Sequence, residues 1–384
     1  MTNIQDIAAQ IGVSVATVSR ALNGSPEVSD ATRERILQLA RELDYTPSAA
    51  ARTLVRRRSQ TVGVILETGP GHPDLLHPFF QEVLVGLQHG AGERGYDLLL
   101  FATDRPGNGL GGRHSYARRA EHHGVGGVVV MGFDREDPEM RQLIAAGVPC
   151  ISVDSDLGGP RCGFVTSDNR AGAAAAVEHL HELGHRRIAT VTGPLDTHPA
   201  ADRLDGFREA ARRLGLRVPD EYVVEGDFYA ESGYRATGGL LALLEPPSAI
   251  FAASDMMAAG VLQAAHEVGL GVPDDLAVIG FDDIAVAALL QPPLTTVRQE
   301  MEELGRAAAQ GLIQMIEDPD APPARVQVPA RLIIRASTAG KHAPREEAHG
   351  LTKEVERTVG DGRFGRSPDD GAALVTEEST TKEA

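Results

Sequence analysis

The side chains best suited to bind a charged partner are gathered at the amino-terminal end of this 384-residue chain. Residues 1–60 carry eight arginines against six acidic residues, and four of these arginines fall within residues 52–58. The formal net charge of the whole chain is −17, so the remainder is strongly acidic. A local basic patch can still bind phosphate, because physiological salt screens charges beyond ~8 Å. The arginine pattern therefore favours a nucleic-acid partner for this end.

Residue types that carry most catalytic chemistry are absent from the body of the chain or scattered through it. All three lysines lie in the last 44 residues, which excludes a phosphate-loop lysine or a Schiff base in the body. Cys150 and Cys162 match no metal or redox spacing and are predicted to be isolated reduced thiols. The glycine-rich stretch Gly107–Gly112 does not follow a strand, as a dinucleotide loop must. We expect no enzyme activity, no metal and no cofactor.

Signals for a membrane or for export are not found in the sequence. No apolar run reaches the ~18 residues that a membrane span requires. The amino terminus has neither the basic segment nor the apolar stretch of a secretory signal. We therefore expect a cytoplasmic protein with no membrane partner. Residues 341–384 are polar and acidic with few apolar positions, which predicts a disordered tail.

The elements that must position the amino-terminal arginines are three short helices. Apolar residues within Ile4–Ile11 fall on one helical face, and Gly12 ends that helix. Ser14 is placed to cap a second helix, Val15–Leu22, and Ser29 to cap a third. Such closely spaced short helices are typical of a helix-turn-helix DNA reader. A fourth helix is predicted to start at Thr46-Pro47, with too little apolar surface to be stable alone.

From Thr61 onward, apolar runs alternate with helical segments. The runs are continuous, as in a parallel sheet that is covered on both faces. Nine strand candidates are too many for one compact doubly wound sheet of typical size. We therefore predict an α/β core of two doubly wound parallel-sheet subdomains with a cleft between them. Ligands of such sheets bind at the carboxyl ends of the strands, which here face the cleft.

Several sequence blocks occur in the order and spacing of a known family. Near the amino terminus they are Ile4-Gln5-Asp6-Ile7-Ala8, Gly12-Val13-Ser14, Thr17-Val18-Ser19-Arg20-Ala21-Leu22-Asn23, and Tyr45 to Leu54 with Pro47, Ser48, Ala51 and Arg52. The core adds Asp168-Asn169-x-x-Gly172, Arg203-Leu204-x-Gly206-Phe207, Ser254-Asp255-x-Met257-Ala258 and Val278-Ile279-Gly280-Phe281-Asp282-Asp283. From about residue 3 to 338, the chain resembles the lac repressor family of transcriptional regulators.

The resemblance implies a helix-turn-helix headpiece, a hinge helix and a periplasmic-binding-protein-like core. It implies a homodimer that binds a palindromic double-stranded DNA operator, most simply as a repressor. A small ligand in the core cleft, a mono- or oligosaccharide, would control the affinity for the operator. Two alternatives stay open: a regulator that activates, and a transport-type sugar-binding protein with the same core. The transport alternative needs export and leaves residues 3–54 without a role.

Four parts of the chain follow from these patterns. They are a DNA-binding headpiece at 1–46, a hinge helix and linker at 47–60, an effector-binding and dimerisation core at 61–340, and the tail at 341–384. Within the core, one subdomain is expected at 61–163 plus 297–323 and the other at 164–296 plus 324–340.

Residues that contact DNA are also implied by the resemblance. Val15, Ala16 and Arg20 are expected to read base edges in the major groove, Arg20 by a bidentate contact with guanine. In the hinge helix, Ala51, Arg52 and Leu54 are expected at the minor groove, with Leu54 wedged into a base step. The expected contacts with the DNA backbone are Ser14, Thr17, Ser19, Asn23, Ser29 and Thr32. Plain alternatives are a solvated Arg20, a Leu54 that packs on the core, and hydroxyls that only cap helices.

The effector site implied by the resemblance consists of Phe80, Asp168, Arg203, Phe228, Ser254 and Asp282. Arg203 and Asp282 together suit vicinal sugar hydroxyls, because one donates and the other accepts hydrogen bonds. Phe228 can stack on the apolar face of a ring. Arg203 in an interdomain ion pair and Phe228 in the core are the structural alternatives. Asp196 stands where purine-responsive members have an arginine, which favours a neutral sugar over a purine.

Overall fold

The computed structural model describes residues 3–22, 25–43, 45, 59–66, 75–102, 115–132 and 138–339. Several predictions lie outside these described residues: Asn23, the hinge residues Ala51, Arg52 and Leu54, the glycine-rich stretch at 107–112, and the tail at 341–384. Within the described residues, no helix combines the length and the apolar character that crossing a membrane requires.

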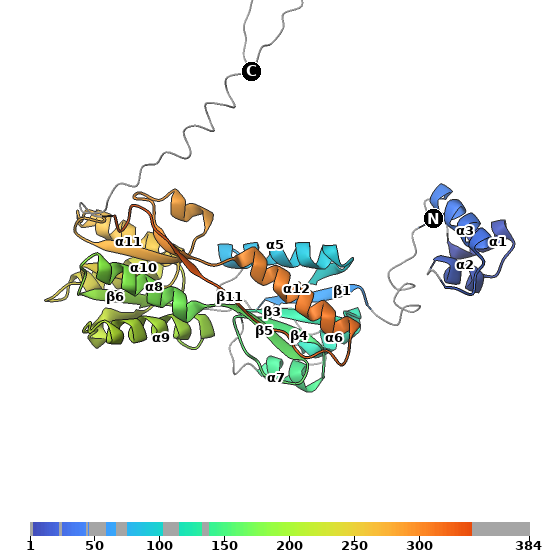
Figure 1. The fold of residues 1–384 in the computed structure, drawn as a ribbon, viewed down its shortest axis with the longest axis horizontal. Coiled ribbons are helices and arrows are strands. Elements are labelled where there is room, and N and C mark those ends of the chain that lie inside the picture. Colours follow the sequence, from blue (N-terminus) through green and yellow to red (C-terminus); the bar gives the residue numbers. More distant parts are fainter. Residues whose placement is uncertain are drawn as a thin grey trace, which may run out of the picture. The chain divides into compact units, whose positions relative to one another are not determined.

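Three helices form the headpiece: α1 (Ile4–Ile11), α2 (Val15–Leu22) and α3 (Asp30–Glu42) (Figure 1). They share a small apolar core in which Ile7, Val18 and Ile36 are fully buried. Asn3 caps the start of α1, and Gly12 ends it with a φ of 77°, a conformation that glycine adopts without strain. The headpiece therefore contains the three closely spaced short helices that the sequence predicts.

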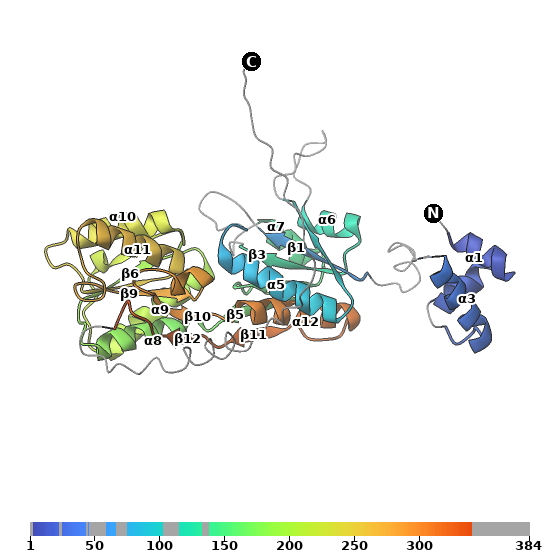
Figure 2. The same cartoon turned by 90° about the horizontal axis from the view of Figure 1, so that it is seen from above.

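The first subdomain is built on a parallel six-stranded sheet. Its order is β11 (Arg325–Val328), β5 (Cys162–Ser167), β4 (Cys150–Val153), β3 (Gly127–Met131), β1 (Thr61–Leu66) and β2 (Asp97–Leu100). Two helices, α5 (Pro78–Glu93) and α12 (Met301–Glu317), cover one face (Figures 1 and 2). The other face is covered by α6 (Tyr116–His123) and α7 (Pro138–Ala145). Successive β1 side chains divide between the faces, with Val64 under α5 and α12 and Ile65 under α6 and α7.

The second subdomain repeats this architecture. Its sheet has the order β12 (Arg331–Ile333), β10 (Thr295–Arg298), β9 (Ala277–Asp282), β8 (Ala249–Ala252), β6 (Ile188–Thr192) and β7 (Val223–Glu225), and only β12 is antiparallel to its neighbour among the described strands. Helices α8 (Asn169–Glu182) and α9 (His198–Arg213) cover one face, and α10 (Ala230–Leu241) and α11 (Asp255–Glu267) the other. The short 3-10 helices are η1 (Asp220–Tyr222) and η2 (Ala285–Ala288).

The chain crosses between the two sheets three times, and the crossings differ from the predicted boundaries. They lie between β5 and α8, between β10 and α12, and between β11 and β12. The predicted second subdomain starts at 164, inside β5, and includes β11, but these two strands pair with each other in the first sheet. An apolar strand carries no local signal of which sheet it will join, so the boundaries shift by a few residues.

Two details of the strands bear on the sequence prediction. The segment from Arg325 to Ile333 is divided into β11 and β12 around Pro329, which has no amide to donate to a sheet. The pairing of β4 with β5 places Cys150 opposite Cys162, so these thiols are neighbours and the prediction that they are isolated is wrong.

Paired helices on each sheet approach closely at glycines. A Cβ added to Gly86 of α5 would lie 2.0 Å from the carbonyl oxygen of Glu302 on α12. On the second sheet, a Cβ on Gly260 of α11 would lie 1.9 Å from the carbonyl oxygen of Ala230 at the start of α10. Any side chain at these glycines would push two helix backbones apart, so the packing of each layer depends on them.

We predict that Gly86→Ala destabilises the protein by about 1–3 kcal/mol, the usual cost of overpacking a core. Gly92→Ala on the same helix is the matched control, because a Cβ there meets nothing within 4 Å. The control is expected to gain ~0.5–1 kcal/mol, since alanine favours a helix over glycine. Urea denaturation of both variants checks this, and equal effects of the two substitutions would contradict the packing.

Candidate functional site

Helix α2 presents the predicted base-reading side chains on its outer face. Val18 and Ala21 point into the headpiece core. Val15, Ala16 and Arg20 are exposed, and Val15 keeps 42% of its accessible surface. The outer face thus combines a small apolar area with one cationic group.

Arg20 forms an ion pair within the headpiece. Its Nε lies 3.2 Å from Oε2 of Glu27, in the turn between α2 and α3. Both side chains are more than half exposed, so the pair contributes at most about 1 kcal/mol. The guanidinium is therefore held by a weak contact and is available to a stronger partner.

The hydroxyls predicted to touch the DNA backbone are engaged at helix starts. Ser14 Oγ accepts the amide hydrogen of Thr17 at 3.0 Å, and the two hydroxyl oxygens lie 2.9 Å apart. Ser29 repeats the arrangement with Thr32, and its hydroxyl donates to that of Thr32 at 2.9 Å. Ser14 and Ser29 therefore carry the capping role that the sequence left as the alternative, and the hydroxyls of Thr17 and Thr32 bond to these caps at the starts of α2 and α3.

A small cavity in the core unites four of the six predicted effector residues. Phe80, Arg203, Phe228 and Asp282 line it, together with His77, Phe79, Asp154 and Pro199. The cavity holds about 50 Å³, well below the ~300–1,000 Å³ of most ligand pockets. Its two aromatic walls come from α5 of the first subdomain and from the turn after β7 of the second. A ligand larger than a few water molecules therefore needs these walls to separate.

The carboxylates of the cavity stand at the carboxyl ends of parallel strands. Asp154 directly follows β4, and Asp282 is the last residue of β9. This is the position at which doubly wound sheets bind ligands. Asp154 is not among the predicted effector residues, although an acidic residue directly after a buried apolar strand is a usable signal in the sequence. His77, Phe79 and Pro199 carried no such signal.

Arg203 lies at the back of the cavity and is only 4% exposed. Its Nε donates to Oδ1 of Asn169 at 2.8 Å, and its Nη1 donates to the carbonyl oxygen of Ala253 at 2.6 Å. Nη1 also lies 3.8 Å from Oδ1 of Asp282, and the guanidinium stacks 3.8 Å above the ring of Phe281. The guanidinium is thus fixed in one orientation before any ligand binds.

Asp282 has one satisfied and one unsatisfied oxygen. Its Oδ1 accepts from Nε2 of Gln299 at 2.7 Å. Its Oδ2 is buried and has no hydrogen-bond partner among the described residues. Burial raises the pKa of Asp282 to about 6, against the opposing attraction of Arg203. An orphaned carboxylate oxygen beside a cavity is an acceptor that a hydroxyl donor can satisfy.

Two further carboxylates, of the partly buried Asp154 and the buried Asp255, lie close enough to Arg203 to interact with its charge. Burial raises the pKa of Asp154, whose Oδ1 accepts from Thr166 Oγ1 at 2.9 Å. Burial also raises the pKa of Asp255, and its carboxylate is shared between the hydroxyl of Thr296 and the amide of Ile284. The site therefore holds more carboxylates than its guanidinium can balance.

Backbone strain is concentrated at the same cavity. Four described non-glycine residues have a positive φ: Asp154 at 63°, Phe228 at 69°, Asp282 at 119° and Asp283 at 60°. Three of the four line the cavity. Such conformations cost of order 1–3 kcal/mol each and cluster at functional sites in proteins. The strain aims these side chains into the cavity at the expense of stability.

Two predicted effector residues do not line this cavity. Asp168 caps α8 by accepting the amide hydrogen of Ala171 at 3.1 Å, and its neighbour Asn169 contacts Arg203 instead. Ser254 caps α11, and its hydroxyl donates to the carbonyl oxygen of Phe228 at 2.9 Å. Ser254 therefore acts behind Phe228, as a support for its strained backbone.

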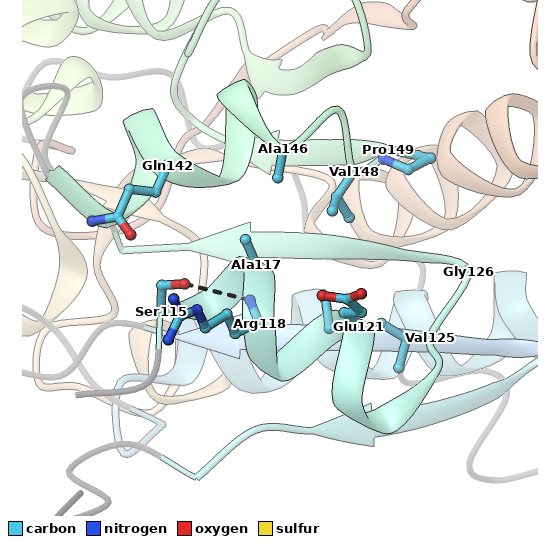
Figure 3. Close-up of a pocket in the computed structure, with 11 residues that line it drawn as sticks. Ser115, Ala117, Arg118, Glu121, Val125, Gly126, Gln142, Ala146, Val148 and Pro149 are labelled. Atoms are coloured by element: carbon cyan, nitrogen blue, oxygen red, sulfur yellow. Dashed lines mark hydrogen bonds between the residues drawn. The ribbon is translucent and has the colours of Figure 1, made fainter. Parts of the chain in front are cut away.

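A larger hollow of about 560 Å³ lies between α6 and α7 in the first subdomain (Figure 3). Its lining mixes aliphatic side chains with Arg118, Glu121 and Gln142, and Ser115 is occupied in capping α6 through the amide of Arg118. It lacks the convergent buried charges of the core cavity. The described residues contain no group of three or more histidine, cysteine or acidic side chains that could hold a metal ion.

The sequence matches the family model of bacterial regulatory proteins, lacI family, over residues 3–48. It matches that of a periplasmic binding protein-like domain over residues 177–338. The HTH-type transcriptional regulator CelR of Thermobifida fusca is 36% identical over 342 residues, which cover 87% of this chain and 97% of that protein. The chain belongs to the lacI family. The ribose operon repressor of Escherichia coli K12 is 35% identical over an alignment that covers 88% of this chain and 100% of that repressor.

Solved structures of lacI-family proteins share the fold. A lac repressor dimer bound to operator and the anti-inducer ONPF aligns with a TM-score of 0.74 at 28% identity, over 88% of this chain and 99% of that one. A CelR–cellobiose complex aligns with a TM-score of 0.65 at 34% identity, over 88% and 100%. The predicted family and fold class are confirmed. This lacI-family member is a transcriptional regulator, and the relatives named here are regulators or repressors rather than enzymes.

We predict that Asp282→Asn stabilises the ligand-free protein at pH 7.5 by up to roughly 3 kcal/mol, from a pKa of 3.8 in the unfolded chain and about 6 in the folded one. Between these values the native state binds the extra proton, so ionisation of Asp282 lowers stability as the pH rises. The gain should therefore shrink as the pH is lowered from 7.5 to 4. Denaturant titrations at several pH values measure it.

Asp283→Asn is the matched control for this prediction. The carboxylate of Asp283 accepts hydrogen bonds from both Arg298 and Arg335 at 2.6 Å. Its loss should cost about 1–3 kcal/mol. If Asp282→Asn destabilised the protein as much as Asp283→Asn, the carboxylate of Asp282 would not be strained by burial.

Proposed function

We propose that this protein is a homodimeric repressor that binds a palindromic operator and whose affinity for the operator is controlled by a neutral sugar. The sugar binds in the core cavity between the two subdomains. The single observation that carries the sugar assignment is the buried Oδ2 of Asp282, which has no hydrogen-bond partner in the part of the chain that the structure describes and lies beside the fixed guanidinium of Arg203.

The headpiece supports the DNA part of the proposal. Helix α2 has an exposed face with Val15, Ala16 and Arg20, and its start lies at the capping hydroxyls of Ser14 and Thr17. Arg20 reads guanine in the major groove, and Val15 and Ala16 contact thymine methyl groups. A hydroxyl that caps a helix can still donate a hydrogen bond to a phosphate. The hydroxyls that contact DNA phosphates in this way are those of Ser14, Thr17, Ser19, Ser29 and Thr32. In the hinge, Ala51, Arg52 and Leu54 enter the minor groove.

The cavity supports the effector part. Arg203 offers donors, Asp282 and Asp154 offer acceptors, and Phe80, Phe228 and Phe79 offer apolar walls. Sugars present this combination of hydroxyl donors and acceptors around an apolar ring face. The relatives point the same way, because CelR has been solved with cellobiose and an Enterococcus faecium regulator at 26% identity with ribose. Cellobiose and ribose are therefore the first ligands to test.

Coupling between the two sites follows from the cavity's location. Because its walls belong to different subdomains, a sugar that enters must change the angle between them. That change alters operator affinity if sugar and operator prefer different angles. The lac repressor structure bound to operator is a dimer, which supports a two-fold arrangement on DNA here as well.

We predict that Arg20→Ala abolishes operator-specific binding while leaving stability within ~1 kcal/mol, because its ion pair with Glu27 is exposed. Glu27→Gln is the matched variant, since it releases the guanidinium without removing it, and it should bind at least as tightly as the wild type. Footprinting and fluorescence anisotropy on operator and scrambled DNA measure both. Unchanged operator affinity in Arg20→Ala would refute the role of α2.

We predict that Asp282→Asn shifts the response to the sugar to much higher sugar concentrations but keeps operator binding. Loss of a charged acceptor from a buried hydrogen bond costs about 1.5–3 kcal/mol, or roughly 10- to 150-fold in sugar affinity. Asp205→Asn on the exposed side of α9 is the control and should respond as the wild type does. A thermal-shift screen of mono- and oligosaccharides identifies the ligand, and anisotropy then follows release from operator DNA. If the Asp282→Asn variant were released from operator DNA at the same sugar concentrations as the wild type, the effector would have to bind at another site.

A further inference from the structure

Two thiols meet at the starts of neighbouring strands, at the ends opposite the core cavity. Cys150 is the first residue of β4 and Cys162 the first of β5, and they are direct partners in the parallel register. Partners in register point to the same face of a sheet. The two sulfurs lie 2.7 Å apart, and both cysteines are free.

The backbone at this position already suits a disulfide. Neighbouring strands run ~4.8 Å apart, inside the range of roughly 4.4–6.8 Å that Cα atoms of bonded cysteines span. The sulfurs need to approach by less than an ångström to reach the ~2.05 Å of an S–S bond. Bond formation therefore requires rotation of the side chains and no change of register.

The two thiols differ in acidity because of their contact. The thiol of Cys150 donates a hydrogen bond to the sulfur of Cys162, which lowers the pKa of Cys162. The same contact, together with burial, raises the pKa of Cys150. Because the thiolate is the reactive form, Cys162 is the group that attacks first and Cys150 the one that resolves the product.

On the α6–α7 side of the sheet, the two cysteines share an apolar cluster with residues that line a surface hollow. Both cysteines are at most 2% exposed and belong to one apolar cluster with Ala120, Val125 and Val148. These three residues also line the hollow between α6 and α7 (Figure 3). The cluster that holds the sulfurs therefore borders a surface hollow. A small, uncharged oxidant that enters the hollow meets a mixed polar and apolar lining first, and apolar side chains nearer the sulfurs.

We propose that Cys150 and Cys162 form a redox-sensitive pair that hydrogen peroxide converts into an intrachain disulfide. The thiolate of Cys162 attacks one oxygen of the peroxide, the O–O bond breaks, and a sulfenic acid and one water are formed after uptake of a proton. The thiol of Cys150 then attacks that sulfur, the S–O bond breaks, and a second water leaves. Two thiols have lost two electrons and two protons, and the peroxide has been reduced to two waters.

The bond joins strands that reach the core cavity at their other ends. Asp154 follows β4, and its carboxylate accepts from Thr166, near the end of β5. The amide of Asp154 also donates to the carbonyl oxygen of Val165. The disulfide therefore fixes the pairing of the two strands that present Asp154, and it closes a short loop between residues twelve apart. Closure of that loop raises the thermal midpoint of the oxidised protein.

The test uses the whole 384-residue chain, in which these are the two cysteines. Protein reduced with dithiothreitol is exposed to hydrogen peroxide, denatured, alkylated with N-ethylmaleimide and weighed by mass spectrometry. We expect both thiols to disappear together as a monomeric product two hydrogens lighter, with a higher thermal midpoint, and dithiothreitol to restore both properties. Persistence of two alkylatable thiols, a disulfide between chains, or overoxidation of a single cysteine would each overturn the proposal.

Single variants separate the two roles. In Cys150→Ala, the sulfenic acid on Cys162 has no resolving thiol and is expected to be trapped by dimedone. In Cys162→Ala, the remaining thiol is expected to react with peroxide at least tenfold more slowly. Equal rates in both variants would contradict the assignment of Cys162 as the attacking group, and the wild-type experiment stands even if a variant folds poorly.

Discussion

The arrangement of the core cavity depends on the removal of one guanidinium from water. Burial of a charge costs several kcal/mol unless hydrogen bonds and opposite charges surround it. Arg203 meets this requirement with an amide from the start of α8, a carbonyl from the end of β8 and a carboxylate from the end of β9. The hydrogen bonds and the ion pair of Arg203 therefore bring three separate segments of the second subdomain together at the wall of the cavity.

More carboxylates lie around Arg203 than its single positive charge can neutralise, and this excess of acceptors suits a ligand. Asp154, Asp255 and Asp282 all have a raised pKa because burial opposes their ionisation around a single cation. Three strained backbones hold the lining of the cavity in place at a further cost. A protein selected for stability alone would remove these features. Their presence together is explained by a ligand whose hydroxyl groups donate hydrogen bonds to the carboxylates of the cavity.

Prediction from sequence succeeded where a short segment determines its own structure and failed where distant segments meet. The caps at Ser14 and Ser29 are local, and the structure contains both. Asp168 and Asp154 both follow apolar strands, yet only the second lines the cavity, because strand order and the crossing to the second sheet decide which strand end faces it. The meeting of Cys150 with Cys162 depends likewise on β4 and β5 becoming neighbours. No pattern within either strand contains that information.

The three crossings between the sheets have a mechanical consequence. Bodies joined by one strand can swing and twist in any direction, whereas three links side by side leave few independent motions. The segments between β5 and α8, between β10 and α12, and between β11 and β12 join sheets whose strands β11, β5, β12 and β10 lie at corresponding edges. Three links at one pair of edges restrict the relative motion of the subdomains more than a single link would. A displacement at the cavity can therefore be passed to the first sheet along fewer directions.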